Sequence, residues 1–337
     1  MMDYREKARE RVKCCKVCHV CNGKACAGQV PGMGGIGTGM SFQNNLTVLA
    51  ALRIMPRYLH GINTPDTTTE LWGRKLSLPV MAAPIGDVIK NLGSDMPTDR
   101  YTELLVKGCR DAGTFASFGD TPQIEATAKK FAVLGDNGNM TIPFFKPWPP
   151  NDLVSRMDMA AEHGCCICGL DVDAAGFHGF TAISPNFGVR TGQDIEKTAD
   201  MAHRRGMKFI IKGIMSPVDA LVAVDSGVDS VLVSNHGGRA IDCTPGTAEV
   251  LPAIVDAVGG KTLIMVDGGV RTGIDILRML ALGAALVLIC RPVAIAAHGD
   301  EENGVRLYFE DLQRQLAAAM RLTGCATVDA INRAVLC

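Results

Sequence analysis

Eight short apolar runs separated by helix-length connections constrain the fold of this chain more than any other feature. Each has the composition of a buried parallel strand, and the stretches 153–163, 194–205, 218–226 and 274–282 between them repeat apolar residues at helical spacing. Eight such units are typical of a closed (β/α)8 barrel, the TIM barrel. We therefore predict an α/β chain whose residues 41–337 form this barrel from strands at Pro79–Pro84, Thr114–Phe118, Thr141–Phe145, Cys165–Asp171, Lys208–Lys212, Ser230–Ser234, Leu263–Asp267 and Leu286–Ile289.

Length and charge narrow the class of protein. A chain of 337 residues with 47% apolar content can bury one large core. Its formal net charge of −1 excludes the basic footprint of a nucleic-acid binder. No apolar run reaches the roughly 18–20 residues of a membrane span, and residues 1–16 are charged where a secretory signal is apolar. These features predict a cytoplasmic protein.

A histidine and an arginine follow the sixth predicted strand in the run Val233-Ser234-Asn235-His236-Gly237-Gly238-Arg239. Active sites of such barrels lie at the carboxyl ends of the strands. The imidazole of His236 suits a general base, and the planar guanidinium of Arg239 suits a substrate carboxylate. A carboxylate must then support the protonated imidazole. Asp173 is our candidate, although Asp171 lies on the same face and the sequence does not separate the two.

A phosphate cradle follows the seventh and eighth strands. Gly268 and Gly269 allow close backbone approach, and Arg271 and Arg291 supply charge and forked hydrogen bonds. This is the usual phosphate position of the fold and predicts a bound flavin mononucleotide. Lys212, which follows three apolar residues, would stabilise negative charge on the reduced flavin.

The segment upstream of the barrel, residues 1–40, is rich in cysteine and glycine. Cys15, Cys18, Cys21 and Cys26 contain CxxC spacing twice in succession, which resembles the ligand run of an iron–sulfur cluster or a zinc site. We favour metal over an exposed reduced tail. A cluster would give reduced flavin an electron exit, whereas zinc would only pin the segment. The glycine-rich stretch 32–39 has no preceding strand, so we expect a tight loop against another backbone and no nucleotide site.

These motifs resemble the FMN-dependent 2-hydroxy acid dehydrogenase and oxidase family, which includes glycolate oxidase and lactate oxidase. The resemblance extends from about Ser41 to the carboxyl terminus and is strongest from Ile211 to Pro292. It implies that His236 is the base, Arg239 the carboxylate clamp and Asp173 the partner of His236. It also implies a tetramer or larger homo-oligomer, and FMN contacts from Pro84, Ile85, Gly86, Ser117, Lys146, Asp171, Lys212, Ser234, Asp267, Gly268, Gly269, Arg271, Cys290 and Arg291.

The chain departs from the family pattern on the substrate side. Lys146-Pro147-Trp148 stands where Gln-Leu-Tyr is usual, Asp171-Val172-Asp173 replaces Thr-Val-Asp, and Cys290 replaces the glycine of Gly-Arg-Pro. The arginine expected after the fourth strand falls near His178. We therefore expect Trp148 and His178 to face the substrate.

The sequence predicts an enzyme that oxidises a small L-2-hydroxy acid, similar to lactate or glycolate, to the 2-keto acid with FMN. The electron acceptor, whether oxygen, quinone or a partner protein, is open. One alternative is an FMN barrel of the isopentenyl diphosphate isomerase or glutamate synthase type, which lacks the paired histidine and arginine. Another is a redox carrier or sensor in which the cysteine segment is the active part.

Overall fold

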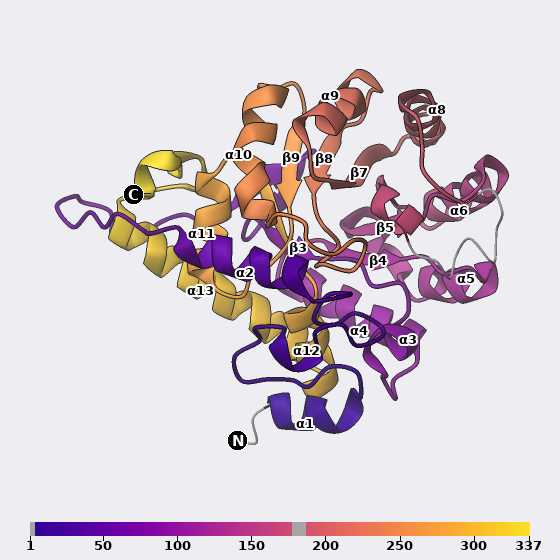
Figure 1. The fold of residues 1–337 in the computed structure, drawn as a ribbon, viewed down its shortest axis with the longest axis horizontal. Coiled ribbons are helices and arrows are strands. Elements are labelled where there is room, and N and C mark those ends of the chain that lie inside the picture. Colours follow the sequence, from indigo (N-terminus) through magenta and orange to yellow (C-terminus); the bar gives the residue numbers. More distant parts are fainter. Residues whose placement is uncertain (1–3, 177–186) are drawn as a thin grey trace.

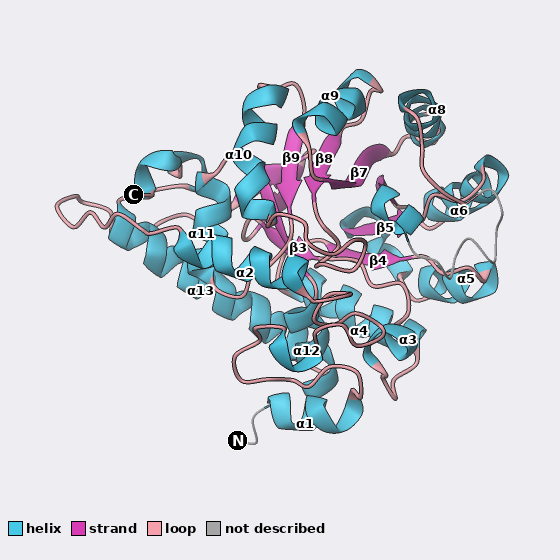
Figure 2. Ribbon diagram, in the orientation of Figure 1, coloured by secondary structure: helices cyan, strands magenta, loops and turns pink. Residues whose placement is uncertain are grey.

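The computed structural model describes residues 4–176 and 187–337. Eight strands form a central sheet, helices surround it, and a short hairpin precedes it (Figures 1 and 2). The strands are β1 (Thr69–Leu71), β2 (Arg74–Leu76), β3 (Val80–Ala82), β4 (Ala116–Gly119), β5 (Thr141–Phe145), β6 (Ile167–Asp171), β7 (Lys208–Ile214), β8 (Ser230–Val233), β9 (Leu263–Val266) and β10 (Leu286–Ile289). The helices are α1 (Tyr4–Arg11), α2 (Met40–Ala51), α3 (Val88–Leu92), α4 (Thr98–Asp111), α5 (Ile124–Ala132), α6 (Pro150–Glu162), α8 (Gly192–His203), α9 (Pro217–Asp225), α10 (Thr247–Val258), α11 (Gly273–Ala281), α12 (Arg291–Gly299) and α13 (Gly304–Thr323).

The sheet is parallel throughout, with the strand order β3-β10-β9-β8-β7-β6-β5-β4. Its first and last strands meet where Ala82 N donates to the Phe115 carbonyl at 3.3 Å, which closes the ring. All eight barrel strands overlap the predicted runs. The four predicted helices correspond to α6, α8, α9 and α11. The predicted (β/α)8 barrel is confirmed.

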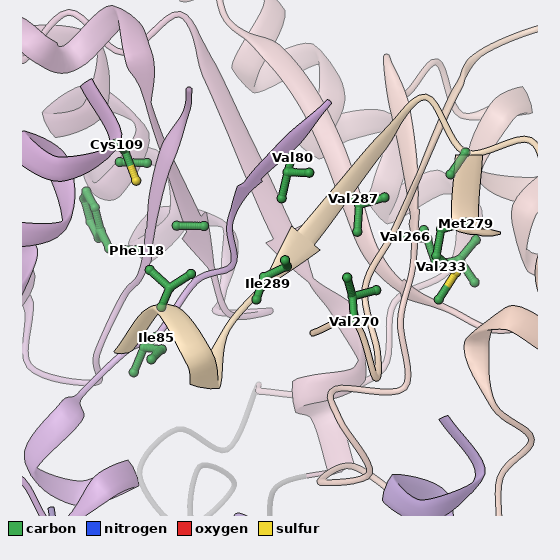
Figure 3. Close-up of a cluster of buried hydrophobic side chains, with 14 of the residues drawn as sticks. Val80, Ile85, Cys109, Phe118, Val233, Val266, Val270, Met279, Val287 and Ile289 are labelled. Carbon is green, nitrogen blue, oxygen red and sulfur yellow. The ribbon is translucent and has the colours of Figure 1, made fainter. Parts of the chain in front are cut away.

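Two buried cores hold the barrel together. One fills its interior and includes Phe144, Ile210, Leu232 and Leu288, joined at the amino-terminal side by the β1–β2 hairpin. The other lies between the strands and the outer helices. Figure 3 shows part of it, with Val80, Val233, Val266 and Val287 contributed by four strands. Because both faces of every strand are apolar, the strands appear in the sequence as nearly continuous hydrophobic runs.

The amino-terminal segment lies against the barrel. Helix α1 packs on α12 (Figure 1). The glycine-rich loop, residues 32–39, is bonded to the barrel through Ile36 N, which donates to the Gly238 carbonyl at 2.9 Å. A Cβ on Gly34 would come within 2.5 Å of the Gly23 carbonyl oxygen, so this loop approaches another backbone as its composition predicts. Among the described residues, no helix is both long and apolar enough for a membrane span.

Candidate active site

Strand alternation places polar side chains at the carboxyl mouth of the barrel. Phe144, Ile210 and Leu232 point into the interior core. Successive side chains of a strand alternate between its faces, so the residues two positions later point the same way but lie at the mouth. These residues are Lys146, Lys212 and Ser234, and the same rule gives Asp171, Asp267 and Cys290 on the neighbouring strands.

A cavity of about 320 Å³ opens at this mouth. That volume is in the range of small-molecule and cofactor sites. It is lined by most of the residues that the sequence singled out, namely Pro84, Ile85, Gly86, Lys146, Lys212, His236, Arg239, Asp267, Gly268, Gly269, Arg271, Cys290 and Arg291. The predicted base, clamp and phosphate cradle thus share one cavity.

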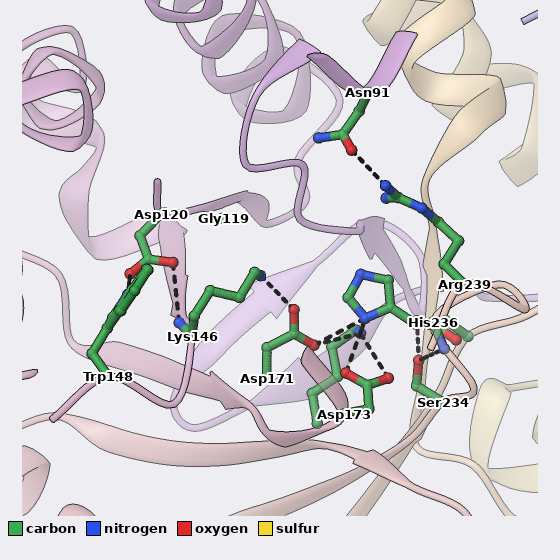
Figure 4. A network of polar contacts seen from close by, with 12 residues as sticks. Asn91, Gly119, Asp120, Lys146, Trp148, Asp171, Asp173, Ser234, His236 and Arg239 are labelled. Carbon is green, nitrogen blue, oxygen red and sulfur yellow. Dashed lines mark hydrogen bonds and ion pairs between the residues drawn. The ribbon is translucent and has the colours of Figure 1, made fainter. Parts of the chain in front are cut away.

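His236 is held by a carboxylate behind it (Figure 4). Its Nδ1 lies 2.9 Å from Asp173 Oδ1 and 3.5 Å from Asp171 Oδ1, so Asp173 makes the direct hydrogen bond. The backbone of His236 is left-handed, with φ of 54°, which is uncommon for a residue with a side chain. Such strain persists only where the surroundings impose it, and it is found preferentially at functional sites.

Asp171 carries two lysines instead of lining the cavity. It is 1% exposed and accepts hydrogen bonds from Lys146 Nζ at 2.6 Å and Lys212 Nζ at 2.7 Å. Burial alone would raise the pKa of Asp171, but the two ammonium groups hold that pKa well below its usual range. Burial likewise lowers the pKa of Lys212, and the charges of Asp171 and Asp173 more than reverse this effect. In the structure Asp171 thus positions two lysines and does not line the cavity, and its predicted contact with the cofactor stays a prediction.

Arg239 is oriented by groups that the sequence did not reveal. Its Nη2 donates to Asn91 Oδ1 at 2.6 Å and its Nε to the Pro31 carbonyl at 3.2 Å (Figure 4). Burial lowers the pKa of this guanidinium. Asn91 belongs to α3, a five-residue helix whose neighbour Lys90 also lines the cavity. A helix this short has too little periodicity to be recognised from the sequence.

Arg271 and Arg291 both line the cavity. Burial and the nearby charge of Arg271 together lower the pKa of Arg291 to about 10. Arg271 precedes α11 directly, and the capping box between Thr272 and Asp275 fixes that turn. A Cβ on Gly269, which has φ of 80°, would meet the Asn45 carbonyl oxygen at 2.7 Å. Two mutually repelling guanidinium groups beside close-packed glycine backbone suit a dianion.

Comparison with known proteins identifies the family. The FMN-dependent dehydrogenase family matches residues 32–176 and 179–337. The chain belongs to this family. It is 30% identical to an L-lactate oxidase of Lacticaseibacillus rhamnosus, over 86% of this chain and 84% of that protein. It is also 30% identical to a 4-hydroxymandelate oxidase of Amycolatopsis orientalis, over 89% and 90% of the two chains.

Solved structures agree with this membership. A Pediococcus acidilactici protein described as a lactate oxidase superposes with a TM-score of 0.78 at 25% identity, covering 98% of this chain and 92% of that one. A mandelate oxidase bound to (S)-2-phenylpropionate gives 0.75 at 28% identity, covering 98% and 96%. The family match begins at residue 32, so the cysteine segment lies outside it.

The cavity of this FMN-dependent dehydrogenase fits its cofactor. Among the described residues, Asp267 Oδ1 and Arg271 Nε are buried side-chain atoms without a hydrogen-bond partner. Buried polar atoms are almost always paired, so these two are suited to a ligand's hydroxyl and phosphate groups. Asp267, Arg271 and Arg291 would hold the ribityl chain and phosphate, and Lys212 would face the ring.

Four predicted contact residues, Ser117, Trp148, Asp171 and Ser234, do not line the cavity. Trp148 lies three residues beyond the end of β5 and does not line the cavity. Its indole donates to Asp120 and lies under the Arg156 guanidinium, 4.9 Å from the ring centroid. Ser117 is also away from the cavity and donates to the Ala82 carbonyl at 2.6 Å, on the seam that closes the barrel.

Ser234 supports the site from behind. Its Oγ donates to Asp267 Oδ2 at 2.8 Å and accepts from His236 N at 3.1 Å, so it positions two residues of the cavity without lining it. His178 lies outside the described residues. Asp120, at the end of β4, went unnoticed in the sequence although it lines the cavity. Its place directly after a buried strand was the available signal.

Proposed function

We propose that the chain oxidises a small L-2-hydroxy acid to the 2-keto acid with FMN. The observation that carries this proposal is the sharing of one cavity by His236, backed by Asp173, with Arg239 and the phosphate cradle. Relatives named L-lactate oxidase and 4-hydroxymandelate oxidase support the substrate class, because lactate and 4-hydroxymandelate are both 2-hydroxy acids. A base and a carboxylate clamp at one cavity are the two groups that this chemistry requires.

The residues divide the work as follows. Arg239, held in place by Asn91, binds the substrate carboxylate through paired hydrogen bonds. His236 has Nδ1 committed to Asp173, so Nε2 accepts the proton, and Asp173 stabilises the resulting imidazolium. FMN, when bound in the cavity, would supply the acceptor for the two electrons that leave the substrate carbon.

The floor of the cavity carries two lysines. Lys146 and Lys212 are both ion-paired to Asp171, and Lys212 Nζ also lies 4.0 Å from Asp173 Oδ2. We propose that Lys212 stabilises negative charge at the edge of the reduced cofactor, and that Lys146 supports it from the neighbouring strand. Lys90 adds a further cation at the rim.

Anaerobic titration of the purified holoenzyme with 2-hydroxy acids tests the proposal. L-lactate, glycolate and L-mandelate would each be added, with the D-enantiomers of the chiral acids as controls. Bleaching of the flavin absorbance by at least one L-acid, with the matching keto acid formed in equal amount, is the expected result. A protein that binds FMN but is bleached by none of these acids would contradict the proposed substrate class.

Two further properties belong to the proposal. We propose a homotetramer or larger assembly, supported by Tyr58 and Leu59, whose exposed fractions of 69% and 100% leave an apolar segment open to a second copy. Light scattering coupled to gel filtration measures this, and a monomer would refute it. We also propose a partner protein that accepts electrons from the enzyme. We further propose a metal cofactor at the amino-terminal cysteines, either an iron–sulfur cluster or a zinc ion.

A further inference from the structure

The cysteine segment is built onto the barrel beside the phosphate cradle. Arg271 Nη2 donates to Cys21 Sγ at 3.9 Å, and Arg291 donates to the Met33 carbonyl of the following loop. From the other side, helix α1 holds the segment: Arg9 Nη2 donates to the Val17 carbonyl at 3.0 Å, and Arg5 Nη1 donates to the His19 carbonyl at 3.0 Å. These contacts give the segment a defined path.

The turn between Cys15 and Cys18 has an unusual backbone. Val17 is β-branched, 4% exposed and has φ of 45°, a conformation that such residues rarely adopt. In this conformation Val17 N points to Cys15 Sγ, at 3.5 Å. A strained turn that directs an amide at a sulfur suggests a functional constraint on that sulfur. Hydrogen bonds to sulfur are also a known means of tuning iron–sulfur clusters.

Four of the five thiols in the segment share the run C-x2-C-x2-C-x4-C. Cys15, Cys18 and Cys21 are half-buried and Cys26 is buried. Cys26 Sγ donates to the Gly23 carbonyl at 3.8 Å, and Cys15 Sγ accepts from Val17 N. Cys14 is different, because its Sγ faces Gly93, where a Cβ would come within 3.0 Å of it.

The spacing of the sulfurs separates two kinds of metal site. Four thiolates around one zinc ion lie about 3.8 Å apart, as follows from a tetrahedron with Zn–S of about 2.3 Å. Within residues 4–176 and 187–337, only Asp171, Asp173 and His236 form a group of three ligands with all atoms within 4.8 Å of one another. Among the described residues, no three of the cysteine sulfurs thus lie within 4.8 Å of one another, as a mononuclear zinc site would require. In a four-iron cluster each thiolate binds a different iron, so the sulfurs stand farther apart.

We propose that Cys15, Cys18, Cys21 and Cys26 bind a four-iron, four-sulfide cluster. Their C-x2-C-x2-C-x4-C run begins with the same spacing as bacterial cluster-binding runs. Four thiolates bring four negative charges, and the guanidinium of Arg271 is hydrogen-bonded to one of them. The cluster would lie at the phosphate end of the cavity.

Metal analysis of the full chain, purified without oxygen, tests this proposal. We expect about four iron and four acid-labile sulfide per chain, a broad absorption near roughly 400 nm, and a paramagnetic resonance signal after dithionite reduction. Cys18→Ser and Cys21→Ser should each lose most of the iron and sulfide. Cys14→Ser is the matched control, since it removes a thiol of the same segment and should retain the full content.

Each other outcome overturns the proposal. Zinc at one ion per chain without sulfide would show a mononuclear site, and wild-type protein with no metal and four reactive thiols would show an empty one. If Cys14→Ser lost as much iron as Cys18→Ser and Cys21→Ser, the assignment of the four ligands would be contradicted. FMN measured in the same samples separates this inference from the proposed function: full FMN without iron contradicts only the cluster, whereas iron with FMN that no hydroxy acid reduces contradicts only the substrate.

Discussion

Asp171 and Asp173 lie two residues apart at the end of one strand, and their partners give them different roles. Asp171, fully buried, neutralises Lys146 and Lys212. Asp173, where β6 has given way to a 3-10 turn, is more exposed and reaches His236. Two carboxylates that are equivalent in the sequence are thus distinguished by one lysine pair. This assignment depends on the side chains of neighbouring strands, so it could not be read from the sequence.

Asp173→Asn should slow oxidation of the hydroxy acid without releasing FMN. An amide cannot stabilise the imidazolium of His236, so kcat/KM should fall by about 10²- to 10⁴-fold, the usual contribution of a positioned base. Stopped-flow reduction of the flavin measures this directly. The dissociation constant of the 2-keto acid product should stay within a few-fold, and a rate of flavin reduction equal to that of the wild type would exclude Asp173 from the reaction.

Arg239→Lys should weaken substrate binding, because an ammonium group cannot form the paired hydrogen bonds of a guanidinium. We expect KM for the acid to rise about 10- to 100-fold, as for loss of a charged hydrogen bond. Asn91→Ala keeps the guanidinium but removes its 2.6 Å partner, so its KM should rise less. If both variants kept the wild-type KM, the carboxylate would have to bind elsewhere.

At the scale of elements, the parts that could be predicted are those with strict periodicity. The strands are apolar on both faces, and the positions of Lys146, Lys212 and Asp267 at the ends of apolar runs indicate that they lie at the mouth. Trp148 was expected to face the substrate from its place in the family pattern, but it lies three residues beyond the end of β5 and does not line the cavity. Asn91 was missed because it lies on a short helix, where side-chain direction depends on tertiary contacts. Asp120 was missed although it directly follows the buried strand β4.

The turn after β9 offers a test of the phosphate cradle. Gly269 and Gly260 have nearly equal φ values, 80° and 79°, so alanine strains both backbones alike, by roughly 1–2 kcal/mol. A Cβ would meet the Asn45 carbonyl oxygen at Gly269 but nothing within 4 Å at Gly260. We therefore expect Gly269→Ala to raise the dissociation constant of FMN at least tenfold and Gly260→Ala to leave it unchanged. Equal FMN affinities, measured by fluorescence quenching, would show that the turn does not hold the phosphate.

At the scale of the whole molecule, a buried lysine joins the cavity to the barrel seam. Lys130 on α5 is 1% exposed, and its ammonium group donates to the Gly86 carbonyl and, at 2.7 Å, to the Gly119 carbonyl. Gly86 lines the cavity and Gly119 ends β4. Burial lowers the pKa of Lys130 from 10.5 to about 8, and the charge of Asp120 opposes this only in part.

This pKa predicts how the free energy of unfolding depends on pH. Between about pH 8 and 10.5 the folded chain has lost the Lys130 proton while the unfolded chain still holds it, so stability should rise with pH in that window. The shift corresponds to a contribution on the order of 3 kcal/mol at 1.36 kcal/mol per pKa unit. Urea unfolding from pH 7 to 10.5 would compare Lys130→Met with Lys129→Met, whose side chain is exposed. Only Lys130→Met should remove this rise. If the free energy of unfolding of both variants kept the wild-type dependence on pH, the Lys130 ammonium would have to be as well solvated as that of Lys129. The burial of its charge would then not contribute to the pH dependence.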